Sequence, residues 1–183
     1  MSLLEITGLT HSFGENLLYK NAGFTLNKGE HIGIVGQNGT GKSTLIKICT
    51  EQIIPDSGRV IWRPNITIGY LDQYAEIDHT LTMKEFLKSA FAKLFEIEIQ
   101  VMQLYEKAAD GDMKNLELAA YYQEQLETHD FYSIDTAIER VANGLGLLAI
   151  GLDRPIIEMS GGQRAKVILA KLLLEKPDVL LLD

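Results

Sequence analysis

The sequence predicts an α/β fold, and three observations along the chain support this prediction. A β-branched apolar run at 31–35 precedes a glycine-rich loop, and an apolar helical pattern follows that loop. From about 82 to 145 the apolar residues recur at three- and four-residue steps, which is typical of helices. The stretch at 178–182 is short and continuously apolar after Asp178, as in the buried strands of parallel sheets. We therefore expect an antiparallel β subdomain, a parallel-sheet core and an inserted all-α subdomain.

Each expected element follows from a local pattern of apolar residues and turn signals. Alternation or a short apolar run predicts strands at 2–13, 18–26, 31–35, 59–62, 66–71 and 178–182. Helical spacing predicts helices at 45–54, about 82–105, 116–126, 133–145 and after 160. We expect Ser133 to cap the 133–145 helix, and the two helices before it to form an antiparallel hairpin that turns near Gly111. The expected domains are a nucleotide-binding core over 1–74 and 155–183, and a helical subdomain over 75–154.

The loop after the 31–35 run fits the phosphate-loop pattern G-x-x-x-x-G-K-[ST] at every required position. Its glycines allow backbone N–H groups to surround a phosphate, and the helix that follows favours an anion at its N-terminus. Lys42 would reach the β- and γ-phosphates of a nucleoside triphosphate, and the Ser43 hydroxyl would bind Mg²⁺. The residues expected to bind nucleotide here are Gly36, Asn38, Gly39, Gly41, Lys42, Ser43 and Thr44.

Two later features extend this prediction. The strand predicted at 178–182 leads into Asp183, a carboxylate that could hold Mg²⁺ directly or through water. Ser160, Gly161, Gly162 and Gln163 lie where another helix begins, so a hydroxyl, two glycines and a helix dipole could form a second anion site. Each feature alone is common, but this order of features in one chain is not expected by chance.

The arrangement resembles the nucleotide-binding domain of ATP-binding-cassette proteins over essentially the whole chain. The resemblance implies that Phe13 stacks on adenine and that Gln73 contacts Mg²⁺ and the attacking water. Asp183 matches the Walker B aspartate, so the implied catalytic residues are Gln73 and Asp183, and the implied metal ligands are Ser43, Gln73 and Asp183. Residues 160–163 match the family signature, although Met159 stands where leucine is usual. The implied cofactors are ATP and Mg²⁺.

The resemblance also implies that two cassettes, in one longer chain or in a homodimer, close head to tail around two ATP molecules. Ser160, Gly161, Gly162 and Gln163 would then complete the partner's site. In this family the catalytic glutamate directly follows the Walker B aspartate and the switch histidine comes later, so neither lies within the sequence. We expect this polypeptide to bind ATP with little turnover, and the full-length protein to be an ATPase.

Composition and charge indicate where the protein acts and which segment is chemically distinct. The chain has no apolar run of membrane-spanning length and no signal peptide, so we expect a cytoplasmic protein without direct membrane insertion. The formal net charge is −8 for 183 residues. Residues 75–150 hold 14 acidic and 6 basic side chains, so this segment carries all of the excess negative charge.

The 87 positions from Gln73 to Ser160 exceed the helical subdomain of a typical transporter cassette. With the inserted hairpin, this length resembles the first cassette of the F subfamily, whose members lack membrane domains and in many cases act on the ribosome. An arm that contacts RNA should be basic, yet this segment is acidic. The hairpin could contact a basic protein, its lysines could cluster at the tip, or RNA contacts could lie elsewhere. The alternatives are the ATP-binding subunit of a membrane transporter, whose membrane domain would be the partner, and a non-catalytic nucleotide-binding scaffold.

Overall fold

The computed structural model describes residues 1–71, 80–108 and 112–183. The chain forms two compact units, of which the first comprises Met1–Ala75 with Pro177–Asp183 and the second, here called the helical unit, comprises Glu76–Lys176. Residues 155–176, expected in the nucleotide-binding core, belong to the helical unit instead. They do so because helix α6 (Gly161–Glu175) buries its apolar face in the core of that unit.

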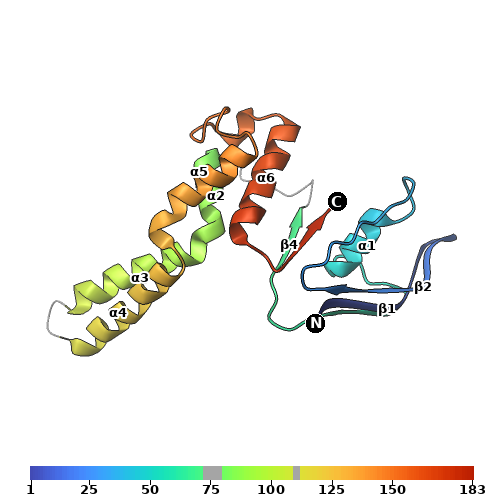
Figure 1. Ribbon diagram of the computed structural model, residues 1–183, viewed down its shortest axis with the longest axis horizontal. Helices are drawn as coiled ribbons and strands as arrows, with labels where there is room; N and C mark the ends of the chain where they lie inside the picture. Colours follow the sequence, from blue (N-terminus) through green and yellow to red (C-terminus); the bar gives the residue numbers. More distant parts are fainter. Residues whose placement is uncertain (72–79, 109–111) are drawn as a thin grey trace. The chain divides into compact units, whose positions relative to one another are not determined.

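The first unit contains an antiparallel sheet, a parallel strand pair and a helix (Figure 1). Strands β1 (Ser2–Phe13), β2 (Asn16–Asn27) and β3 (Ser57–Trp62) form the antiparallel sheet in the order β2-β1-β3. Strands β4 (Ile68–Leu71) and β5 (Val179–Leu182) pair in parallel. Helix α1 (Lys42–Cys49) begins at the end of the glycine-rich loop.

The core of the first unit lies between β1 and α1. Leu4, Ile6 and Leu9 are buried on β1 and pack with Ile48 and Cys49 of α1. The indole Nε1–H of Trp62 donates to the Cys49 carbonyl oxygen at 2.8 Å, which fixes the end of α1 against β3. This packing holds the phosphate loop (36–44) at the edge of the antiparallel sheet.

The strand expected at 31–35 is not formed, so this prediction was wrong. Residues 31–37 have no regular secondary structure, and Val35 is 94% exposed. A strand requires a hydrogen-bonded neighbour, and the parallel sheet seen in the described part of the chain has only β4 and β5. The helix expected at 45–54 also ends earlier, because Glu51 adopts a positive φ of 59°.

The helical unit is a bundle of helices and short 3₁₀ turns. Its α-helices are α2 (Met83–Lys88), α3 (Ala92–Ala108), α4 (Met113–Thr128), α5 (Ile134–Gly144) and α6. The 3₁₀ turns are η1 (Ser89–Phe91), η2 (Phe131–Ser133) and η3 (Ile156–Glu158). The first expected helix, about 82–105, is therefore two helices, since the Ser89 hydroxyl donates to the Phe86 carbonyl at 2.6 Å where η1 begins. Ser133 precedes α5 but makes no side-chain cap, which corrects another prediction.

The core of this unit is formed by side chains from all of its main helices except the outer part of the hairpin. Its largest fully buried members are Met83, Leu87, Leu126, Ile138, Leu147, Ile156 and Val167. A capping box starts α2, in which the Glu85 N–H donates to the Thr82 hydroxyl and the Glu85 carboxylate accepts from the Thr82 N–H. These contacts account for the bundle as an independently packed unit.

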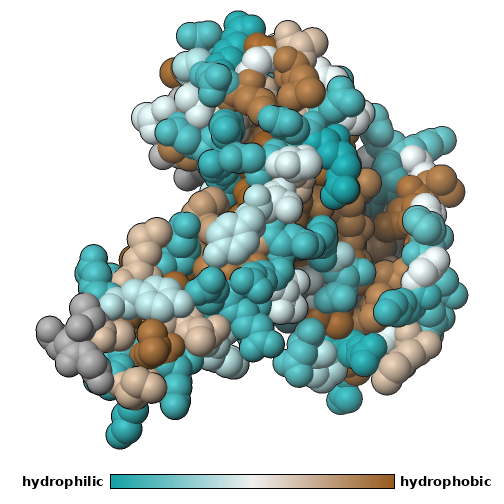
Figure 2. Space-filling view, turned by 60° about the vertical axis from the view of Figure 1, so that its left-hand side comes forward, coloured by the Kyte–Doolittle hydropathy of each residue, from teal (hydrophilic) through white to brown (hydrophobic). Residues whose placement is uncertain are grey.

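Helices α3 and α4 lie side by side as a hairpin (Figure 1). The Tyr105 hydroxyl donates to Gln123 Oε1 at 2.6 Å and links the two helices. The expected turn at Gly111 lies outside the described residues. Figure 2 shows apolar residues at the surface next to the grey residues. Along α3 and α4, the side chains of Ile99, Met102 and Tyr121 are exposed. None of the helices that the structure describes combines the length and the apolarity needed to cross a bilayer.

Candidate nucleotide-binding site

A pocket of about 530 Å³ opens beside the phosphate loop in the first unit. The residues that line it are Phe13, Asn16, Leu18, Asn38, Gly39, Gly41, Lys42, Ser43, Thr44 and Asp183. Eight of these ten are residues that the sequence predicted, from three segments far apart in the chain. The structure therefore brings together the loop, the end of β1 and the residue that follows β5.

The conformation of the phosphate loop depends on two glycines with positive φ and on hydrogen bonds from Lys42. Gly39 and Gly41 have φ values of 85° and 99°, which a residue with a side chain adopts only with strain. The Lys42 ammonium donates to the carbonyl oxygens of Gly36 and Gln37, at 3.0 and 2.8 Å. Both bonds are exposed, so the same ammonium could exchange these carbonyls for the oxygens of an anion. Helix α1 begins at Lys42, and its first turn contains no acidic side chain to oppose an anion.

Ser43 and Asp183 meet at the same pocket although 140 positions separate them. The Ser43 hydroxyl donates to Asp183 Oδ1 at 2.9 Å. Two hard oxygen atoms at this distance suit Mg²⁺, which prefers oxygen ligands and usually shares them with substrate phosphates. Within residues 1–71, 80–108 and 112–183, no group of three His, Cys, Asp or Glu side chains could hold a metal ion. The two oxygen atoms of Ser43 and Asp183 fit a metal that a bound phosphate would also coordinate.

Tyr19 forms a hydrogen bond to the phosphate loop. It lies on β2, and its hydroxyl donates to the Gly41 carbonyl oxygen. Partial burial raises the pKa of the Tyr19 phenol, so this hydroxyl keeps its proton and remains a donor at neutral pH. The sequence did not single out Tyr19, because its distance from Gly41 depends on how β2 packs against α1.

The aromatic side of the pocket is formed by Phe13, the last residue of β1. Phe13 is 54% exposed, and its ring lies edge to face with the ring of His11 at a centroid distance of 4.9 Å. Register shifts in β1 at His11 and Ser12 mark an irregularity of the kind that redirects side chains near functional sites. Phe13 thus lines the pocket, and its ring contacts the His11 ring.

Gln73, the other expected catalytic and metal-binding residue, lies outside the described residues. The signature segment (160–163) begins α6 in the helical unit. Its Ser160 hydroxyl accepts from the Gln163 N–H at 3.3 Å, and Gln163 Oε1 accepts from the Ser160 N–H at 2.9 Å, which forms a capping box. A Cβ atom added at Gly161 or Gly162 would meet no atom within 4 Å among the described residues, apart from its chain neighbours and the backbone of its own helix. Packing within the described residues therefore does not explain these two glycines.

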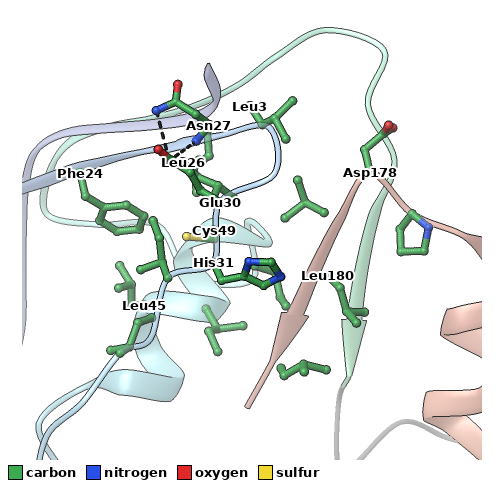
Figure 3. A pocket seen from close by; sticks show the side chains of 18 of the residues that line it. Leu3, Phe24, Leu26, Asn27, Glu30, His31, Leu45, Cys49, Asp178 and Leu180 are labelled. Carbon is green, nitrogen blue, oxygen red and sulfur yellow. Dashed lines mark hydrogen bonds between the residues drawn. The ribbon is translucent and has the colours of Figure 1, made fainter. Parts of the chain in front are cut away.

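A second pocket of the first unit, about 520 Å³, has a different chemistry (Figure 3). Apolar side chains such as Leu3, Phe24 and Leu180 point into it. At its rim the Glu30 carboxylate accepts from the Asn27 N–H at 2.7 Å, a bond that lowers the pKa of Glu30. Most of the side chains that line this pocket are apolar, and no lysine or arginine is among them, so the candidate phosphate site is the one beside Lys42.

Comparison with known proteins gives the family. The family model described as "ABC transporter" matches residues 19–183. The chain belongs to the ABC transporter family. It is 46% identical over 187 residues to the uncharacterized ABC transporter ATP-binding protein YfmM of Bacillus subtilis (strain 168), and this match covers 100% of the chain and 36% of YfmM.

Two further relatives are an F family member and a protein named for a role in translation. ABC transporter F family member 2 of Arabidopsis thaliana is 32% identical over 188 residues, which cover 98% of the chain and 28% of that protein. The energy-dependent translational throttle protein EttA of Escherichia coli (strain K12) is 35% identical over 169 residues, which cover 91% of the chain and 30% of EttA. The chain thus spans about a third of the length of these curated relatives.

The ABC fold is also found among solved structures. A structure described as the ATP binding subunit of an ABC transporter has a TM-score of 0.67 and 19% identity, covering 100% of this chain and 66% of that one. A nucleotide-free ATP-binding cassette from an ABC transporter has a TM-score of 0.60 and 23% identity, covering 100% and 69%. At these identities the likeness concerns the fold, and it confirms the expected α/β cassette architecture.

Proposed function

We propose that this ABC cassette binds Mg-ATP in the pocket beside the phosphate loop, and that the full-length protein hydrolyses it. The hydrogen bond between Ser43 and Asp183 carries this proposal, because it joins the two expected metal ligands at the loop that would hold the phosphates. The Lys42 contacts support it, since the two carbonyl oxygens that accept from its ammonium are exposed and could be exchanged for phosphate oxygens.

Each residue of the pocket would have a distinct role. Lys42 and the backbone N–H groups of the loop would bind the β- and γ-phosphates. Ser43 and Asp183, with Gln73, would hold Mg²⁺, which offsets phosphate charge when it is bound. Phe13 would stack on the adenine ring from the exposed side of its own ring.

The signature segment would complete the site of a second cassette. Gly161 and Gly162 leave the start of α6 uncovered, so a phosphate bound to a partner could approach the helix N-terminus closely. Ser160 and Gln163 already form the capping box there, which would hold the segment in one conformation before the partner arrives. The second cassette could belong to the same longer protein or to another copy.

We further propose that the full-length protein is of the F type and acts on the ribosome during translation. The similarity to an F family member and to EttA supports this assignment. The α3–α4 hairpin offers an exposed surface through which such a protein could reach a partner. Its described residues 92–128 contain seven acidic and three basic side chains, so RNA phosphates would not be their natural ligand.

The alternative is the ATP-binding subunit of a membrane transporter. The relative YfmM is named an ABC transporter ATP-binding protein, which keeps this function in consideration. Ribosome co-sedimentation of the full-length protein, with and without ATP, separates the two. The F-type assignment expects co-sedimentation that depends on nucleotide. Recovery in a membrane fraction with an integral membrane partner, and none with ribosomes, would contradict it.

A further inference from the structure

His11 is a buried histidine whose role the nucleotide site does not explain. It is 5% exposed on β1, and neither of its ring nitrogens has a hydrogen-bond partner within the part of the chain that the structure describes. Buried polar atoms are usually satisfied, because a buried donor or acceptor without a partner costs free energy. An apolar residue would fill this position at lower cost, so the histidine calls for a reason beyond packing.

The chain provides a carboxylate beside the histidine. Asp56, just before β3, places its Oδ1 atom 3.6 Å from His11 Nδ1. Its Oδ2 atom accepts from the Ser12 N–H at 2.9 Å and from the Ser12 hydroxyl at 2.8 Å. The hydroxyl bond from Ser12 is the main reason that the pKa of Asp56 is lowered, so the carboxylate is charged at neutral pH. Asp56 therefore fixes the backbone at Ser12 and lies against His11 at the same time.

Ser12 lies between His11 and Phe13 in the chain, so this arrangement reaches the nucleotide pocket. The His11 and Phe13 rings meet at 4.9 Å with an interplanar angle of 82°, a favourable edge-to-face geometry. Phe13 is about half exposed and lies at the end of an irregular strand. The contact with His11 and the bonds from Ser12 to Asp56 restrict both the ring and the backbone of this region.

We propose that His11 and Asp56 are positioning residues that hold Phe13 in the orientation in which it stacks on the base of a bound nucleotide. This inference rests on the proposed function, because it assumes a nucleotide in the pocket lined by Phe13. On this proposal His11 and Asp56 contribute to the affinity for the base, whereas Lys42 and Ser43 provide the affinity for the phosphates. A ligand without a base should not respond to the pair.

The test compares Mg-ATP with magnesium tripolyphosphate, which retains the phosphates and lacks the base. Calorimetry on the full-length protein gives Kd for both ligands. An edge-to-face aromatic contact corresponds to a factor of about 3 to 10 in affinity. We expect His11→Ala and Asp56→Ala to weaken ATP binding by about this factor, and tripolyphosphate binding to change less than about twofold. Asp56→Asn keeps an oxygen for the Ser12 donors and should restore most of the ATP affinity.

A double-mutant cycle shows whether His11 acts through Phe13. In a Phe13→Ala background, His11→Ala should have no further effect on the Kd for ATP. An undiminished effect in that background, an equal loss for ATP and tripolyphosphate, or no loss in either single variant would overturn the proposal. Asp56 is half exposed, so its variants provide the measurement if His11→Ala fails to fold. If the wild-type protein binds neither ligand, the proposed function itself fails.

Discussion

The capping box at the start of α6 allows the structural and the functional roles of Ser160 to be separated. Ser160→Ala removes the acceptor for the Gln163 N–H but leaves the Ser160 N–H bonded to Gln163 Oε1. The lost bond is long, at 3.3 Å, so its loss should lie at the lower end of the range for N-cap substitutions, about 0.5–1 kcal/mol. For a chain of this size that corresponds to a fall in Tm of about 1–4 °C.

Ser160→Asp is the matched variant. An aspartate is also a good N-cap and interacts favourably with the helix dipole, so the Tm should stay at or above the wild-type value. Its negative charge should instead repel a phosphate that approaches the start of α6. Calorimetry measures Tm, and FRET between labelled cassettes of the full-length protein measures ATP-dependent closure. We expect closure to be lost in Ser160→Asp and weakened in Ser160→Ala. An unchanged Tm in Ser160→Ala, or normal closure in Ser160→Asp, would refute the reasoning.

Three further predictions concern stability and reactivity. Ile138→Ala, in the core of the helical unit, should lower the free energy of unfolding by about 2–5 kcal/mol, whereas the exposed Ile99→Ala should cost less than about 0.5 kcal/mol in urea titrations. The bonds from Thr82 lower the pKa of Glu85 in the folded state, so its contribution is present above its ordinary pKa of 4.5 and is lost as the pH falls through the folded value. Wild-type protein should therefore lose Tm relative to Glu85→Gln on acidification from pH 5 to pH 3, and parallel curves would contradict this. Burial raises the pKa of Cys49 to about 11, so a thiol reagent at pH 8 should label it only after unfolding, and rapid labelling of folded protein would contradict its burial.

The phosphate loop could be predicted residue by residue because its chemistry is encoded in short spacing. Gly41, Lys42 and Ser43 each follow from what a phosphate and a metal require, and the structure lines one pocket with all three. Asp183 could be expected there because the apolar strand before it, closed by a carboxylate, resembles the Walker B element of the family. The 2.9 Å bond to Ser43 is the contact that such an arrangement implies.

What the sequence missed depends on contacts between distant segments. The 31–35 run has the composition of a strand, but a strand forms only where a neighbour can pair with it, and composition cannot show that neighbour. Ser133 has a good capping side chain, yet η2 occupies the turn before α5 and the hydroxyl makes no capping bond. Tyr19 and His11 reach the site only through the packing of β1 and β2, so no local motif marked them.

The most direct measurement of the central claim is the binding of Mg-ATP to the full-length protein by calorimetry, in parallel with Lys42→Ala and Ser43→Ala. Loss of the charged donor should weaken binding by about 10- to 100-fold, because hydrogen bonds to charged groups are worth about 1.5–3 kcal/mol. Ser43→Ala should weaken binding in the presence of Mg²⁺ and have a much smaller effect in EDTA. Equal affinity in the wild type and Lys42→Ala would contradict the claim that this pocket is the ATP site.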